Sequence, residues 1–177
     1  MVGFASGRWL GVVAALVLTL SAAPTALAGA QVGTFHFETS FTDPTSLPEC
    51  MPTELADVVG VQAAIETTDG RFTAQENGFH VEGTVTFAYR VDFPDGRYAI
   101  GIGNSRFATD FTASGQSVNG EVTREPRTIY AADGSVLVRV LISAGTHVTF
   151  RDGNGNGQPD PGEISVAFER LSFICGR

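Results

Sequence analysis

The fifteen residues from Phe79 to Phe93, FHVEGTVTFAYRVDF, alternate between apolar and polar side chains. Successive side chains of a β-strand point to opposite faces of a sheet, so this alternation predicts a long strand with one buried face. A strand of this length needs neighbouring strands for its backbone hydrogen bonds, which constrains the fold more than any other feature of the sequence. The positions on the predicted buried face are Phe79, Val81, Val85, Phe87, Tyr89, Val91 and Phe93, with Gly83 as a gap.

Turn signals recur at short intervals and separate this strand from other strand-like runs. Asn-Gly and Asp-Gly tolerate the positive φ angles of tight hairpins. The runs at 136–150 and 164–175 are rich in β-branched and aromatic residues and are also predicted strands; Ile164, Val166 and Phe168 share one face of the second. The turn signals are TDG (68–70), ENG (76–78), PDG (94–96), GNS (103–105), SGQ (114–116) and ADG (132–134).

Two runs depart from simple alternation. The apolar residues of 97–113 change parity near Gly101 and Gly103, which predicts a bulge or a tight turn there. Pro126 lies in the polar run TREPRTIY and predicts an edge strand, a bulge or a broken strand, because proline cannot donate to a sheet ladder. No stretch has strong helical periodicity, although one helical turn could follow Pro52.

These patterns predict an all-β domain built as an antiparallel meander of eight or nine strands. Such a meander can close into an up-and-down β-barrel, which we expect, or fold into a two-sheet β-sandwich. Cys50 and Cys175 are the two cysteines of the chain, and their places near its two ends favour closure. We expect them to form one structural disulfide, because the sequence also indicates an extracellular protein.

The extracellular assignment comes from the N-terminus. Arg8 precedes the apolar run Leu10–Leu20, and the small residues Ala26–Ala28 follow it. This pattern is typical of a secretory signal peptide, residues 1–28, with cleavage after Ala30 as the close alternative. We therefore expect one secreted domain, residues 29–177, without a lipid anchor or membrane insertion.

Composition excludes several classes of chemistry. The chain has no lysine, so Schiff-base catalysis and a phosphate-binding P-loop lysine are both impossible. A net charge of −8 makes nucleic acids and anionic membranes poor candidate partners, because an acidic protein repels both. The use of arginine for every basic residue suggests a GC-rich genome, such as an actinobacterial one.

The segment RDGNGNGQPDPGE, residues 151–163, has the ligand spacing of a calcium loop. Calcium takes six to eight oxygen ligands, and short acidic and amide side chains at alternate positions can supply them. Predicted strands flank the segment in place of helices, and Pro159 replaces the usual aliphatic residue, so it is not an EF-hand domain. A metal-free Asn/Gly turn is the alternative. The predicted ligands are Asp152, Asn154, Asn156, Gln158 (through its carbonyl), Asp160 and Glu163.

This segment resembles the strand–loop–strand calcium loops of B-type repeats in Gram-positive surface adhesins. From Leu47 to Cys175, the chain also resembles an uncharacterised family of small secreted actinobacterial all-β proteins. That resemblance lies in a cysteine before TELADVVG, in SAGTHVTF and in FERLSFIC. It implies an all-β domain closed by one disulfide and implies no activity.

Other candidates for chemistry are scattered. His36, His80 and His147 show no metal-ligand spacing, and we expect them to lie apart. Four acids, Glu82, Asp92, Asp110 and Glu121, could supply a catalytic pair but form no motif.

We therefore expect a secreted, non-catalytic domain with a structural calcium-binding hairpin and an extracellular binding or structural role. One alternative is a lipocalin-like barrel for a small apolar ligand. Another is an enzyme with a His/carboxylate site inside the barrel. The sequence identifies no partner beyond such a ligand or an extracellular protein.

Overall fold

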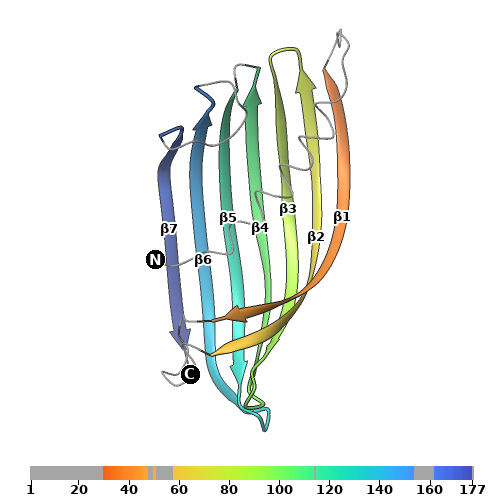
Figure 1. Cartoon of the computed structure of the whole chain (residues 1–177). Helices are drawn as coiled ribbons and strands as arrows, with labels where there is room; N and C mark the ends of the chain where they lie inside the picture. Colours follow the sequence, from red (N-terminus) through yellow and green to blue (C-terminus); the bar gives the residue numbers. More distant parts are fainter. Residues whose placement is uncertain (1–29, 48–49, 51–57, 114, 154–161, 177) are drawn as a thin grey trace.

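The fold is a single sheet of seven antiparallel strands (Figure 1). The computed structural model describes residues 30–47, 50, 58–113, 115–153 and 162–176. Each strand pairs with the strands that precede and follow it in the chain, which confirms the predicted up-and-down meander, with fewer strands than expected. The strands are β1 (Gln31–Ser46), β2 (Val59–Gln75), β3 (Gly78–Asp92), β4 (Tyr98–Thr112), β5 (Gln116–Tyr130), β6 (Val136–Arg151) and β7 (Ile164–Gly176).

The predicted signal peptide and the possible helical turn after Pro52 lie outside the described residues. Within the described ranges, no helix is long and apolar enough to cross a bilayer.

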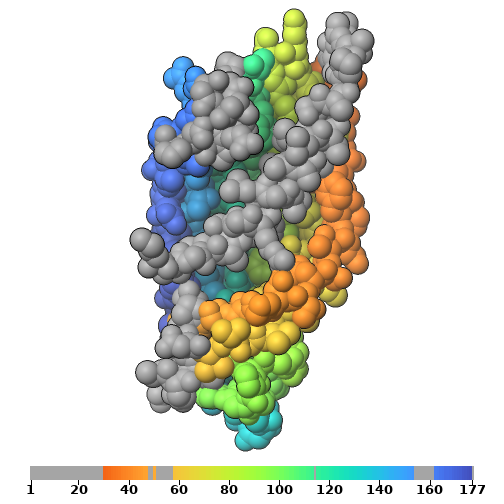
Figure 2. All heavy atoms as spheres, viewed as in Figure 1, coloured from red at the N-terminus to blue at the C-terminus, as the bar shows by residue number. Residues whose placement is uncertain are grey.

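The sheet curls without closing. β1 and β7 are its two edges, so the barrel closure that we expected is not formed, and the single sheet does not fit the sandwich alternative. At one end of the sheet, β1 and β2 bend across the other strands toward β7 (Figures 1 and 2). The curl gives the sheet a concave face, which carries Val81, Val91 and Ile129, and an opposite convex face.

The hydrophobic core lies on the concave face at the curled end. It combines Ala64 of β2 with Val140 and Ile142 of β6, which belong to strands far apart in the sheet order. The curl is what brings these side chains together, because a flat sheet would hold them several strands apart. The remaining buried members are Leu47, Tyr89, Val91, Phe93, Ala99 and Ile129, with Phe41, Leu171 and Phe173 packed against them.

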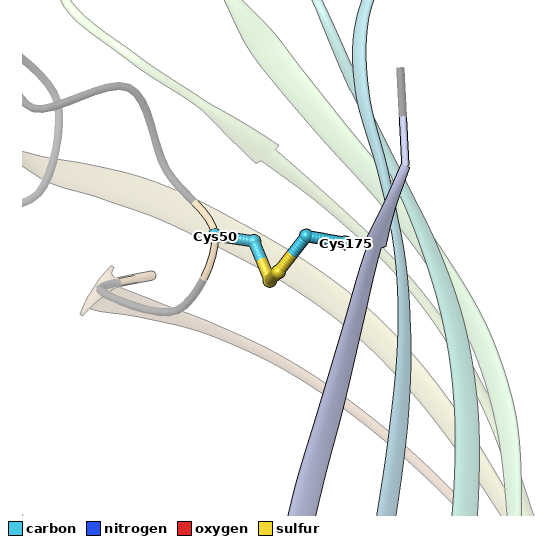
Figure 3. The surroundings of a disulfide bond; sticks show 2 residues. All are labelled: Cys50 and Cys175. Atoms are coloured by element: carbon cyan, nitrogen blue, oxygen red, sulfur yellow. A yellow bond between two sulfur atoms is a disulfide. The ribbon is translucent and has the colours of Figure 1, made fainter.

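One disulfide fastens the curled end. Cys50 follows β1, Cys175 lies near the end of β7, and their Cα atoms are 5.8 Å apart (Figure 3). The predicted pairing is confirmed. It links residues 125 positions apart, and the chain-entropy model gives a stabilisation of about 4–5 kcal/mol for a loop of this length.

Two hairpins at the curled end use the same turn. The Phe93 N–H donates to the Arg97 carbonyl over 3.0 Å, and Gly96 has a φ of 85°. The Ala131 N–H donates to the Ser135 carbonyl over 2.8 Å, and Gly134 also has a φ of 85°. Glycine adopts this left-handed conformation without the steric cost of a Cβ. The PDG and ADG predictions are confirmed.

The turn predictions at 68–70 and 103–105 are wrong, because these residues lie inside β2 and β4. The predicted bulge or tight turn at Gly101 and Gly103 is also wrong, since β4 pairs with β3 in one unbroken register and keeps the same register against β5 before and after these residues. Ile100 and Ile102 instead face outward on the convex side, where Ile102 is 62% exposed.

Pro126 lies in an interior strand, so the predicted edge position is wrong. It is opposite Leu141 of β6, and the ladder between β4 and β5 skips Ile102 and Gly103 near the missing donor. A register shift does occur in β5, between Ile129 and Tyr130.

The prediction that Ile164, Val166 and Phe168 share one face of β7 is wrong. A register shift between His147 and Val148 separates Phe168 from Ile164 and Val166. Phe168 pairs with His147 and reaches over Gly145 on the convex face.

Candidate functional site on the concave face

A column of polar side chains runs along β4 and β5 on the concave face. Antiparallel pairing places Ser105 opposite Thr123 and Thr109 opposite Asn119. Ser105 is 1% exposed and Thr109 is 3% exposed, although polar side chains usually face water. The other members of the column, all on β5, are Glu121, Glu125 and Arg127.

Glycines of β4 allow aromatic side chains of β3 to reach this column. Gly101 lies opposite Tyr89, and Gly103 lies opposite Phe87. A Cβ at either glycine would collide with the ring of its partner, so only glycine leaves room for the ring to lie across β4. The Tyr89 hydroxyl therefore reaches past β4 and donates to the Glu125 carboxylate.

Tyr89, Glu125 and Arg127 form a buried network at the curled end of the column. Arg127 Nε donates to the Tyr89 oxygen over 2.6 Å, and Arg127 Nη2 donates to Glu125 Oε1 over 2.8 Å. The side chains of Arg127 and Glu125 are 7% and 13% exposed, so their opposite charges compensate each other away from water.

Burial raises the pKa of Tyr89, and the effect outweighs the opposing charge of Arg127. Burial alone would lower the pKa of Arg127, but Tyr89 and Glu125 raise it above its ordinary value. Tyr89 therefore stays a hydrogen-bond donor and Arg127 stays charged. The network anchors the end of the column.

The middle of the column is a second polar cluster. The Ser105 hydroxyl donates to the Glu121 carboxylate, and the Thr123 hydroxyl lies 3.0 Å from Ser105 Oγ and 3.3 Å from Glu121 Oε1. The carboxylate thus accepts hydrogen bonds from the protein's own hydroxyls. It gives this part of the concave face a negative charge.

The part of the column nearest the uncurled end has two polar atoms that lack hydrogen-bond partners among the described residues. Thr109 Oγ1 and Asn119 Oδ1 are closed off from water and have no hydrogen-bond partner among the described residues. A buried polar atom without a partner costs about 1–3 kcal/mol. A ligand that donates a hydrogen bond to this pair would remove that cost.

Apolar side chains flank the column toward the uncurled end of the sheet. The rings of Phe72 and Phe79 are 5.6 Å apart, and those of Phe79 and Phe111 are 6.1 Å apart. Gly70 and Gly83 pair across β2 and β3, and the rings of Phe35 and Phe107 cover them from either side. Val81 and Val85 are buried between these groups. The column therefore has an apolar wall on its β1–β3 side.

The three histidines lie on the convex face and do not converge, as expected. His36 Nδ1 is 2.7 Å from Asp69 Oδ1, and this hydrogen bond raises the pKa of His36. His80 Nδ1 is 2.6 Å from Asp110 Oδ1, whereas His147 lies on β6 and is exposed.

The candidate acids are also separated. Glu82 pairs with Arg71, and Asp92 with Arg90, both on the convex face. Asp110 is held by His80, and Glu121 belongs to the concave column. His80 Nε2 is also 3.9 Å from Glu82 Oε2, so Glu82 and Asp110 share this histidine on the convex face, whereas Asp92 and Glu121 lie apart from them.

The predicted calcium hairpin lies at the uncurled end, opposite the disulfide. The Arg151 N–H donates to the Glu163 carbonyl over 3.0 Å, and the Gly153 N–H donates to Glu163 Oε1 over 2.8 Å. The Asp152 N–H donates to the Gly115 carbonyl in the β4–β5 turn over 3.1 Å. The first and last predicted ligands therefore lie close together.

The other predicted ligands, Asn154, Asn156, Gln158 and Asp160, lie outside the described residues. Within the described part of the chain, no three His, Cys, Asp or Glu side chains form a metal site.

Sequence reasoning missed the polar column. One feature of the sequence could have revealed it. Every second residue of β5, counted back from the buried Ile129, is polar and faces inward: Arg127, Glu125, Thr123 and Glu121. Of this column only Glu121 is a sequence-predicted candidate, as one of four acids, because the register of β5 against β4 is not evident from the sequence.

No protein-family model, curated protein or solved structure matches the chain. The site is therefore interpreted from its own geometry.

Gly101→Ala tests the packing of Tyr89 across β4. The added methyl group should displace the ring and break the contact with Glu125, lowering the free energy of unfolding by about 1–3 kcal/mol, as overpacking does. Urea denaturation of the oxidised protein measures the change.

The matched control is Gly120→Ala on β5, where an added Cβ meets no atom within 4 Å. Its effect should be neutral or slightly stabilising, because alanine restricts the unfolded chain. Equal destabilisation by the two substitutions would contradict this account of Gly101.

Proposed function

We propose that the protein is a secreted, non-catalytic binding domain that holds a small amphipathic ligand on its concave face. The observation that carries the proposal is the unsatisfied pair Thr109 and Asn119 beside an apolar wall. Ligand sites commonly combine apolar walls with a few placed polar groups. The described residues supply no second layer over this part of the sheet, since their strands form one sheet.

The column also selects the chemistry of the ligand. Asn119 Oδ1 can only accept a hydrogen bond, and the nearby Glu121 carboxylate repels another carboxylate. A hydroxyl, amide or amine head satisfies both conditions. The apolar body would lie against the Phe72, Phe79 and Phe111 rings.

Binding fits the column better than catalysis does. Ser105 and Glu121 contact each other, but an activated serine needs a base that is itself oriented by a third group. The histidines, which most often act as that base, lie on the convex face. An enzyme with an internal His/carboxylate site therefore has no support from this geometry.

Barrel closure belongs to the same proposal. β1 and β7 are edge strands that run in the same direction. We propose that a bound ligand draws the uncurled end inward and narrows the gap between these edges, as in a lipocalin-like barrel. The disulfide holds the other end in place.

Displacement of the fluorescent aromatic amine 1-aminoanthracene tests the proposal on the secreted, oxidised protein. Dodecylamine and dodecanol should compete with the probe, and dodecanoate should compete at least tenfold more weakly because of Glu121. Asn119→Leu should weaken probe binding about five- to tenfold, consistent with loss of one hydrogen bond.

The control for this test is Asn104→Leu, which alters an exposed convex position of β4 and should leave probe binding unchanged. Absence of saturable probe binding, or equal competition by dodecanoate and dodecylamine, would contradict the proposed site.

Structural calcium binding by the β6–β7 hairpin is a second candidate function. Its support is the closeness of Asp152 and Glu163, together with the sequence pattern between them. Asp and Glu carboxylates are ligands that calcium prefers, and a bound ion would tie β6 to β7 at the uncurled end. The ion would rigidify the hairpin and perform no chemistry.

With three predicted carboxylates, we expect a dissociation constant of roughly 10⁻⁴–10⁻³ M, as in extracellular modules. About 2 mM calcium should then raise the melting temperature by a few degrees relative to chelator. Asp152→Ala and Glu163→Ala should remove the shift, whereas Glu76→Ala, in the β2–β3 turn, should retain it. The same melting temperature in calcium and in chelator, with no heat of binding, would show that the loop is a metal-free turn.

A further inference from the structure

The convex face of β4–β7 carries arginines without acidic partners. Arg106, Arg124, Arg139 and Arg170 are exposed and form no ion pair with the described residues. On β2 and β3 the convex arginines are paired: Arg71 contacts Glu82, and Arg90 contacts Asp92.

The pairing register places these arginines close to one another. Arg106 is opposite Val122 and Arg124 is opposite Asn104, so the two arginines are diagonal neighbours, about 7–8 Å apart at Cα. Val122 is opposite Gly145, which is opposite Arg170. Arg106 and Arg170 therefore belong to one row, roughly 14 Å apart across three strand spacings.

Few acids lie among them on β4–β7, whereas β2 and β3 carry Asp69, Glu82 and Asp92 on the same face. Asp110 of β4 is paired with His80, while Glu121 and Glu125 of β5 point to the concave side. Like charges at neighbouring positions destabilise a sheet, so the fold itself gains nothing from this arrangement. The net charge of −8 therefore conceals a positive half of the convex face, on β4–β7.

An apolar row lies beside the arginines on the same face. Ile65 is opposite Ala88, which is opposite Ile102, and Leu141 is opposite Ile174. Ile65, Ile102 and Ile174 are 56%, 62% and 65% exposed. Arg124 lies two residues before Pro126 on β5, and Arg139 lies two residues before Leu141 on β6. Because the two strands are antiparallel and Pro126 is opposite Leu141, these arginines flank the row on opposite sides.

We propose that this convex face binds the surface of an anionic lipid membrane. Guanidinium groups pair with lipid phosphates, and aliphatic side chains between them enter the interface between headgroups and acyl chains. A soluble anionic polymer would match the arginines but would not use the exposed isoleucines. The contact is peripheral, because one row of apolar side chains is far narrower than a bilayer core.

Sedimentation of the secreted protein with vesicles tests the proposal at low and physiological salt. Vesicles of equal phosphatidylglycerol and phosphatidylcholine should bind the protein, phosphatidylcholine vesicles should not, and salt should weaken binding. Arg106→Gln and Arg124→Gln should each lower the partition coefficient about fivefold, since each basic residue near an anionic surface contributes to binding. Ile102→Ser should also lower it.

Arg71→Gln is the matched control, because it changes the net charge equally but alters a paired arginine of β2. It should leave vesicle binding unchanged, and circular dichroism should show every variant folded. No binding to anionic vesicles at low salt, or equal loss with Arg71→Gln and Arg124→Gln, would overturn the proposal. Binding to soluble polygalacturonate as tight as that to vesicles of equal charge would overturn the assignment to lipid.

Discussion

A single sheet can bury an apolar face only by curling over itself, and the rest of this structure depends on that constraint. The curl brings Ala64 of β2 against the β6 residues Val140 and Ile142, and it forms the core at one end of the sheet. The disulfide between Cys50 and Cys175 fastens the same end. At the other end, the concave face carries the polar groups that we propose bind a ligand.

Glycine has a specific part in this division. Because Gly101 and Gly103 have no Cβ, the rings of Tyr89 and Phe87 can lie across β4. Tyr89 then contacts Glu125 and Arg127, and this buried network forms the end of the polar column that lies next to the apolar core. The two faces of the sheet thus carry different chemistry. The concave face has a polar column beside an apolar wall, and the convex face of β4–β7 has exposed isoleucines beside arginines that form no ion pair with the described residues.

The sequence predicts those parts of the structure that depend on local pattern. The alternation at 79–93 predicts β3, the PDG and ADG turns predict two hairpins, and two cysteines behind a predicted signal peptide predict the disulfide. It fails where contacts across strands decide the outcome. Ile100 and Ile102 suggested a buried face, but the register against β3 turns them outward.

The polar column was missed for the same reason. Glu121 and Glu125 become inward-facing only through the register of β5 between β4 and β6. An isolated reading of TREPRTIY favours solvent, because carboxylates are rarely buried without partners. Their partners are Ser105 of β4, 16 residues before Glu121, and Tyr89 of β3, 36 residues before Glu125.

The central claim is that the sheet has a packed end and an open end. Hydrogen–deuterium exchange of the oxidised, ligand-free protein measures this difference for each strand. Amides near Val91, Ala99 and Ile129 should exchange slowest, close to the rate set by global unfolding, while those near Phe79 and Phe111 should exchange much faster. Equal protection along the whole length of β3 and β4 would contradict the claim.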